Sequence, residues 1–252
     1  MNVLDKKLQN SIWDLSEIFD DRQISLVTFV NPFSYNWLSN QLSILTSMDY
    51  IFADGALLVR LNNLFYNKAT IGRYSFDFSS IADDSFSYFQ EQELNVAFVG
   101  ATEIEVSKAV ANISSLYPEL KVCYTRSGYF DEEIDMNTCI KDVISSQAQV
   151  LIVGMGSPYQ EEFALAVKSA LKLGDHLRTI ITCGGFLTQT SIRKDYYPIW
   201  VKKTGLRWLY RFLTQKHVRK KVVTQYPRFL FSYCLTGIKY SFHRVCRSNE
   251  MK

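Results

Sequence analysis

The sequence predicts an α/β fold in which a Rossmann-like, mostly parallel sheet is flanked by helices. Two observations support this prediction. From residue 95 onward, apolar strand-like runs alternate with helix-like runs in the order β-α-β-α-β-α-β. All residues of Val150–Val153 are also apolar, which is typical of a strand buried on both faces of a parallel sheet. A chain with 47% hydrophobic and 21% charged residues has the composition of a globular protein.

The expected elements follow from the spacing of apolar residues, which is two in strands and three or four in helices. In the first half we expect helices over Leu4–Phe19, Ser34–Leu45, Ala56–Phe65 and Ser79–Gln92, strands over Ile24–Val30 and Asp49–Ala53, and an irregular segment over Ile71–Phe78. In the second half we expect helices over Thr102–Leu116 and Asp131–Ser146, and strands over Asn95–Val99, Lys121–Thr125 and Arg178–Thr182. Thr102 and Glu105 form a capping-box pattern at the start of their helix.

A glycine turn follows the strand at Val150–Val153 and leads into a further helix. Ser157 is a suitable N-cap for that helix, and Pro158 suits its first turn. The turn therefore presents Gln160 and Glu161 at the carboxyl edge of the sheet, where open α/β folds bind ligands. The alternative, that this is an ordinary strand-to-helix turn, stays open.

Two polar residues, Asn31 and Asp54, come directly after predicted strands. If those strands are parallel neighbours, both side chains reach the same edge of the sheet. The position of Asp54 makes it the best candidate for a general base, although an Asp before Gly55 also commonly forms a turn. The sequence contains no GxGxxG or GxxxxGK[ST] motif, and the dispersed histidines argue against a His-based triad or a metal site.

The C-terminal part of the chain is basic. From Tyr197 onward it has thirteen Lys and Arg residues and one acid, Glu250. We therefore divide the chain into a core, residues 1–190, and a basic, aromatic-rich helical appendage, residues 191–252. Such an appendage could lie on an anionic membrane surface or close over a phosphate, which glycine turns and basic side chains can hold. A solvated basic face on an ordinary packed helix is the open alternative.

The remaining composition points to a cytoplasmic protein. The five cysteines include no CxxC pair, which indicates reduced thiols. We read no signal peptide, and no stretch approaches the length of a membrane span.

Eight short stretches, taken in order, carry a family resemblance. They are Asn31-Pro32, Asp54-Gly55, Gly72, Phe98–Gly100, Gly128–Phe130, Val153–Glu161, Gly184-Gly185 and Leu206–Arg211. Together, over about residues 24–225, they resemble the WecG/TagA/CpsF glycosyltransferases, glycosyltransferase family 26. The resemblance implies a GT-E-like fold. It also implies inverting transfer of an N-acetylmannosamine-type sugar from a UDP donor to a lipid-diphosphate-linked N-acetylglucosamine, with no metal or other cofactor, in the synthesis of a surface polysaccharide such as capsule or O-antigen.

The resemblance also suggests roles for individual residues. Asp54 matches the proposed catalytic base, which removes the proton of the acceptor hydroxyl. The candidates for substrate binding are Asn31, Thr28, Arg73, Gln160 and Glu161. The candidates for binding the nucleotide diphosphate are Gly100, Gly154, Gly156, Gly184, Gly185, Arg211, Arg219 and Lys221.

Four positions depart from the pattern of the family. Phe29 stands in place of Thr, Tyr159 in place of Lys, Thr188 in place of Asp, and Arg207 in place of Glu. These departures leave the donor and the acceptor hydroxyl open.

We expect the partners to be a UDP-sugar, a lipid-linked acceptor and the inner face of the cell membrane, with a homo-oligomer left open. A nucleic-acid partner is not expected, because it would leave Asp54 and the turn at Gln160 unexplained. A non-catalytic nucleotide-binding or assembly protein is the remaining alternative.

Overall fold

The computed structural model describes residues 1–10, 13–19, 24–66, 70–193, 196, 198, 201, 204, 207–214 and 216–250. Its centre is a six-stranded sheet in the order β2-β1-β6-β5-β3-β4, and every neighbouring pair is parallel. The strands are β1 (Ser25–Val30), β2 (Tyr50–Ala53), β3 (Asn95–Gly100), β4 (Lys121–Arg126), β5 (Val150–Gly154) and β6 (Thr179–Thr182). This sheet confirms the predicted Rossmann-like fold, and all six predicted strands are present.

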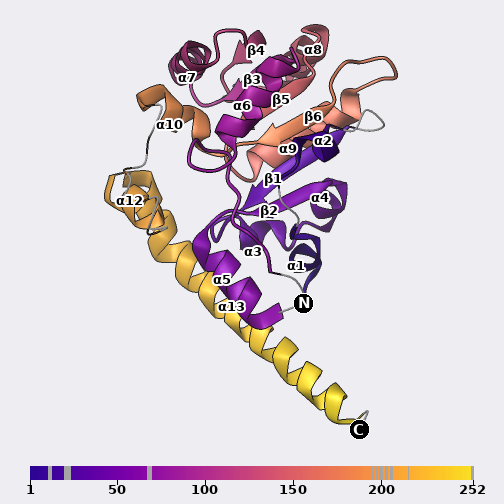
Figure 1. The fold of residues 1–252 in the computed structure, drawn as a ribbon, viewed down its shortest axis with the longest axis vertical. Coiled ribbons are helices and arrows are strands. Elements are labelled where there is room, and N and C mark those ends of the chain that lie inside the picture. The colour runs from indigo at the N-terminus through magenta and orange to yellow at the C-terminus, as the bar shows by residue number, and fades with distance from the viewer. Residues whose placement is uncertain are drawn as a thin grey trace.

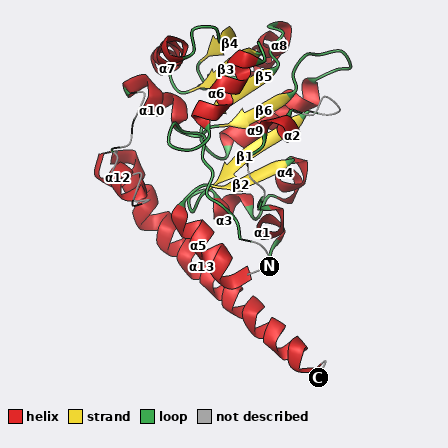
Figure 2. Ribbon diagram, in the orientation of Figure 1, coloured by secondary structure: helices red, strands yellow, loops and turns green. Residues whose placement is uncertain are grey.

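Helices cover both faces of the sheet (Figure 2). The face that includes Leu26 and Leu151 packs against α1 (Val3–Lys7), α3 (Tyr35–Leu38), α4 (Leu42–Ser47), α5 (Ala56–Tyr66), α8 (Glu133–Ser145) and α9 (Tyr159–Ala170). The face that includes Val27 and Ile152 packs against α2 (Leu15–Ile18), α6 (Ala82–Glu91), α7 (Glu103–Leu116) and α10 (Phe186–Ile192). Successive strand residues alternate between the two layers, so the central strands are buried on both faces.

Two of the predicted helices are wrong in extent. The segment predicted as one helix over Leu4–Phe19 forms two short helices, α1 and α2. The helix is interrupted because the chain after α1 joins the edge of the sheet. There, Leu8 forms a β-bridge with Ile51, and the Gln9 amide donates to the Ile51 carbonyl at 2.9 Å. Residues 11 and 12 of this segment lie outside the described residues.

The predicted helix over Ser34–Leu45 is divided into α3 and α4. At the break, the Asn40 side chain donates to the Asn36 carbonyl at 2.7 Å, so a side chain competes with the backbone ladder. Helix α10 was not predicted. The capping box of Thr102 and Glu105 is confirmed.

The C-terminal residues form α12 (Arg207–Thr214) and the long α13 (Lys216–Glu250), which continues through Pro227. Figure 1 shows α13 running beside α5 and extending past the body of the protein. The two helices approach closely at Gly237, where an added Cβ would lie 2.4 Å from a ring carbon of Phe65. No helix among the described residues is long and apolar enough to cross a membrane.

A buried polar cluster fixes α13 to the core. The hydroxyls of Tyr35 and Tyr233 donate to the same oxygen of Asp5, at 2.9 and 3.1 Å, and the Asn62 amide donates to the Tyr233 hydroxyl at 3.0 Å. Asp5 is 6% exposed and Tyr233 1% exposed. Burial raises the pKa of Asp5, and the hydrogen bonds from the tyrosines oppose that rise. The cluster joins the first helix of the chain to the last.

We expect Tyr233→Ala to destabilise the protein by about 3–5 kcal/mol, because it empties a packed site and leaves buried polar groups without a partner. Phe231→Ala is the matched control, since Phe231 is an aromatic residue of the same helix but is 70% exposed. It should change the free energy of unfolding by less than about 0.5 kcal/mol. Denaturant unfolding of both variants checks the prediction, and equal stabilities would contradict it.

Candidate active site

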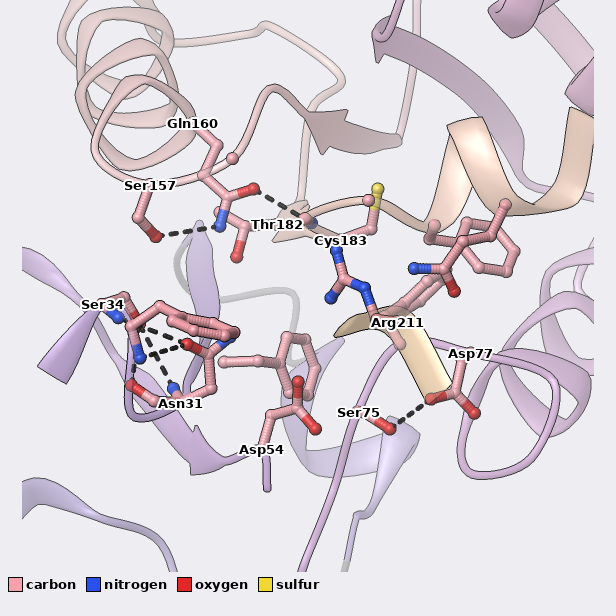
Figure 3. Close-up of a pocket in the computed structure, with 18 of the residues that line it drawn as sticks. Asn31, Ser34, Asp54, Ser75, Asp77, Ser157, Gln160, Thr182, Cys183 and Arg211 are labelled. Atoms are coloured by element: carbon pink, nitrogen blue, oxygen red, sulfur yellow. Dashed lines mark hydrogen bonds between the residues drawn. The ribbon is translucent and has the colours of Figure 1, made fainter. Parts of the chain in front are cut away.

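A cavity of about 410 Å³ lies at the carboxyl ends of the strands, where Asn31, Asp54, Gln160 and Arg211 are arranged around it (Figure 3). It is bordered by the residues that follow β1, β2, β5 and β6, and by α12. The volume falls in the range of small-molecule sites. This edge of the sheet is the one at which the sequence predicts ligand binding.

The edge that carries Asn31 and Asp54 is confirmed. Val30 is paired with Ala53 across the parallel strands β1 and β2, and the Asp54 amide donates to the Val30 carbonyl at 2.7 Å. The side-chain oxygen of Asn31 accepts from the backbone amides of Phe33 and Ser34 at 2.9 and 3.2 Å. Asn31 therefore holds the turn after β1 and at the same time lines the cavity.

Asp54 interacts with a cation from the irregular segment after α5. The Arg73 guanidinium donates to Asp54 Oδ1 at 3.2 Å, and the Asp54 side chain is 31% exposed. Loss of hydration raises the pKa of Asp54 above its ordinary value, and the positive charges of Arg73 and Arg211 oppose the rise. A carboxylate with increased proton affinity beside a cavity is suited to act as a general base.

Asp77 is a second carboxylate at the cavity, and it is not among the residues predicted from the sequence. It accepts from Ser75 Oγ at 2.6 Å and from the Ser79 amide at 2.8 Å, and it lies 3.4 Å from Arg73 Nη2. Burial tends to raise its pKa, but Arg73, Arg207 and the serine hydrogen bonds outweigh burial, so the pKa is lowered. The two aspartates thus differ in proton affinity, as in sites that separate a base from an ionised carboxylate.

A network of hydrogen-bonded side chains joins the turns that border the cavity. Glu161 is 1% exposed, and its Oε1 accepts from Thr28, Ser157 and Gln160 at 3.0, 2.8 and 2.9 Å. Gln160 Oε1 accepts from the Gly184 amide at 3.0 Å. Gln160 therefore ties the turn after β5 to the turn after β6, and Thr28, which is fully buried, supports this layer. The expected N-cap at Ser157 is wrong: Pro158 occupies the N-cap position of α9 without a side-chain hydrogen bond, and the Ser157 hydroxyl donates to Glu161 Oε1.

Among the candidate glycines, Gly156, Gly184 and Gly185 line the cavity. Gly100 and Gly154 lie where β3 and β5 approach each other, and a Cβ on Gly100 would be 2.4 Å from the Gly154 carbonyl oxygen. Of these candidates, three can offer backbone to a ligand, and two are explained by close packing.

Of the two basic candidates of the appendage whose side chains the structure describes, Arg211 lies at the cavity and Arg219 does not. Arg211 lines the cavity beside Gly185, where its Nη2 lies 3.6 Å from the position of an added Cβ. Arg219 instead donates to the carbonyls of Phe212 and Leu213, each at 3.0 Å, at the end of α12. Lys221 belongs to α13, but its side chain lies outside the described residues.

Aromatic residues form much of the cavity wall, and none of them is among the site residues predicted from the sequence. They are Phe29, Phe33, Trp37, Phe76 and Phe186. Phe76 and Phe186 directly follow Ser75 and Gly185 in the sequence, and Phe29 and Phe33 lie two residues to either side of Asn31, so their positions could have indicated the cavity wall. No such signal exists for Trp37. Among the described residues, no group of three or more His, Cys, Asp or Glu side chains could hold a metal ion.

Comparison with known proteins gives consistent matches over most of the chain. The sequence profile of the Glycosyl transferase WecG/TagA/CpsF family matches residues 2–242. The chain is 37% identical over 232 residues to UDP-Gal:alpha-D-GlcNAc-diphosphoundecaprenol beta-1,4-galactosyltransferase from Shigella boydii, covering 92% of this chain and 95% of that protein. It is 22% identical over 230 residues to N-acetylglucosaminyldiphosphoundecaprenol N-acetyl-beta-D-mannosaminyltransferase from Bacillus subtilis strain 168, covering 89% of this chain and 84% of that protein.

We expect Arg73→Gln to raise the pKa of Asp54 further, because the variant removes the closest positive charge and leaves the loss of hydration in place. The titration of the Asp54 carboxyl carbon by NMR measures this pKa directly. Arg60→Gln is the control, since Arg60 is an exposed arginine on α5. An Asp54 titration that is the same in both variants would show that Arg73 does not set the charge of this carboxylate.

Proposed function

The chain belongs to the WecG/TagA/CpsF family of glycosyltransferases, and from this membership we propose that it transfers a hexose from a UDP-sugar to a lipid-diphosphate-linked N-acetylglucosamine. The observation that carries the proposal is the position of Asp54, a carboxylate of raised pKa at a cavity large enough for a sugar nucleotide. The names of both relatives include N-acetylglucosamine linked to diphosphoundecaprenol, which supports this class of acceptor. Synthesis of a surface polysaccharide is the corresponding pathway.

Asp54 acts as the base in a single displacement. Its carboxylate accepts the proton of the acceptor hydroxyl while the hydroxyl oxygen bonds to the anomeric carbon and the bond to UDP breaks. A UDP-linked α-sugar then gives a β-linked product, and the names of both relatives specify a β linkage. Arg73 keeps the carboxylate in place through the 3.2 Å contact.

The departing diphosphate requires positive charge and hydrogen-bond donors. Arg211 supplies the charge and lies next to the turn at Gly184 and Gly185, whose backbone borders the cavity. Donors that are fixed before the reaction stabilise a developing charge without further reorganisation. This arrangement supports a reaction that needs no metal, which stays a prediction.

Galactose is the donor sugar that we propose. The galactosyltransferase shares 37% identity with the chain, whereas the N-acetylmannosaminyltransferase shares 22%. This choice replaces the N-acetylmannosamine-type sugar expected from the family resemblance. Phe29 supports a changed donor pocket, because the aromatic ring lines the cavity at a position where the family pattern has Thr.

We also propose that α13 docks on an anionic membrane. Its outer side carries an apolar stripe of Phe231, Leu235, Ile238 and Phe242, which are 70%, 44%, 58% and 69% exposed. Their spacing of four, three and four residues places them on one face of the helix. Arg228 and Lys239 lie along one edge of this stripe, so that apolar contact and positive charge face the same surface.

We expect Asp54→Asn to lower the rate of acceptor-dependent UDP release by about 10²–10⁴-fold, because the amide cannot accept the proton. The assay uses a panel of UDP-sugars that includes UDP-galactose and UDP-N-acetylmannosamine, with lipid-diphosphate N-acetylglucosamine. UDP affinity, measured by calorimetry, should be retained.

Asp84→Asn is the control for this assay, since Asp84 is exposed on α6. Preferred release from UDP-N-acetylmannosamine would overturn the galactose assignment and leave the reaction class intact. Unchanged release by Asp54→Asn would overturn the role of the base.

We expect the double variant Phe231→Ser, Phe242→Ser to lose binding to phosphatidylglycerol vesicles, because it removes half of the apolar stripe. Sedimentation with vesicles measures the bound fraction, and binding of the wild type should weaken with salt. Val223→Ser is the control: Val223 is 65% exposed on the same helix but lies outside the stripe. Equal binding by all variants would contradict the membrane assignment.

A further inference from the structure

A second, smaller cavity adjoins Asp54. Its volume is about 70 Å³, and it is bordered by Asp54, Arg73, Arg207, Trp208, Arg211 and Tyr226, among others. Asp54 and Arg211 border both this cavity and the larger one. The glycines of the turns after β5 and β6 border only the larger cavity.

The geometry of a single displacement favours different roles for the two cavities. In a single displacement, the attacking oxygen and the departing diphosphate lie on opposite sides of the anomeric carbon. If the diphosphate lies at the glycine turns of the larger cavity, the acceptor oxygen must reach Asp54 from another side. The smaller cavity provides such a side, because Asp54 borders it as well.

Three aromatic rings border the smaller cavity and form a continuous row. The ring centre of Tyr226 lies 5.0 Å from that of Phe33 and 5.6 Å from that of Trp208. Trp208 is 37% exposed, so its ring is partly open to a ligand. Aromatic rings offer a broad apolar surface to the C–H face of a sugar, and Trp and Tyr commonly supply much of the energy of recognition.

The charge of the smaller cavity suits an anionic ligand. Among the described residues, its border includes three arginines, Arg73, Arg207 and Arg211, and two aspartates, Asp54 and Asp77, so the arginines outnumber the aspartates by one. Arg207 is held at the cavity by a 2.6 Å hydrogen bond to Ser79. Guanidinium groups are well suited to bind the oxygens of a diphosphate.

We propose that the smaller cavity is the acceptor subsite: it receives the hydroxyl-bearing edge of a sugar linked to a lipid diphosphate, with Trp208 and Tyr226 against the ring and Arg207 toward the diphosphate. A volume of about 70 Å³ admits this edge and leaves the rest of the ligand at the opening. The proposal rests on the proposed function, because it assigns one of the two substrates of that reaction to a place.

The test measures each substrate separately by calorimetry on the full chain. The acceptor probe is N-acetylglucosamine diphosphate on a short, water-soluble alkyl chain, titrated without donor. The donor probe is UDP-galactose, titrated without acceptor. We expect Trp208→Leu to raise the acceptor Kd by about tenfold or more, with the donor Kd unchanged and partial recovery in Trp208→Phe.

Trp37→Leu is the matched control, since Trp37 borders the larger cavity and not the smaller one. It should raise the donor Kd and leave the acceptor Kd unchanged. Arg207→Gln is a second variant that keeps the aromatic row. It should weaken acceptor binding and reduce the salt dependence of that binding.

The proposal is overturned if Trp208→Leu and Arg207→Gln leave the acceptor Kd unchanged, or if they raise the donor Kd equally. If both Kd values rise equally and the melting temperature also falls, the variant has disturbed the packing of the site, and the acceptor subsite is not supported. Because the acceptor titration needs no turnover, its outcome is separate from that of the proposed function, which depends on UDP release by the wild type.

Discussion

Two partly buried carboxylates at one edge of the sheet, Asp54 and Asp77, require positive charge close by. Charges that lose water destabilise a fold unless partners and hydrogen bonds compensate. Arg73 contacts both carboxylates, and Ser75 and Ser79 complete the hydrogen bonding of Asp77. The cluster organises the irregular segment after α5 and keeps the two carboxylates different, with the pKa of Asp54 raised and that of Asp77 lowered.

The same cluster joins the core to the appendage. Arg207, the first residue of α12, donates to Ser79, so the position of α12 depends on the segment that also holds Asp77. A glutamate at position 207, as in the pattern of the family, would place a third carboxylate near Asp54 and Asp77. An arginine there instead makes the smaller cavity positive. The hydrogen bond from Arg207 to Ser79 thus helps to hold α12 beside the cavity.

Two polar networks of buried side chains set the shape of the site. Glu161 and Gln160 link the turns after β5 and β6, which fixes the backbone at Gly184. Asp5 and Tyr233 anchor α13, and α12 packs against α13 through Trp208 and Tyr226. Residues far from the cavity thus decide where Arg211 lies. The same helix leaves its apolar stripe of Phe231, Leu235, Ile238 and Phe242 exposed.

The sequence by itself determined the strands, the glycine turns and the sheet edge that carries Asn31 and Asp54, because these depend on short-range apolar spacing and on the rule that parallel strands end at one edge. Only the tertiary structure showed that Thr28 and Glu161 are buried, that Arg73 binds Asp54, and that Arg219 caps α12. It also divided two predicted helices, one through a bridge to Ile51. Apart from the local hydrogen bonds of Arg219 and Asn40, these outcomes depend on pairs of residues distant in the chain, such as Thr28 and Glu161, whose meeting is decided by the order of the strands.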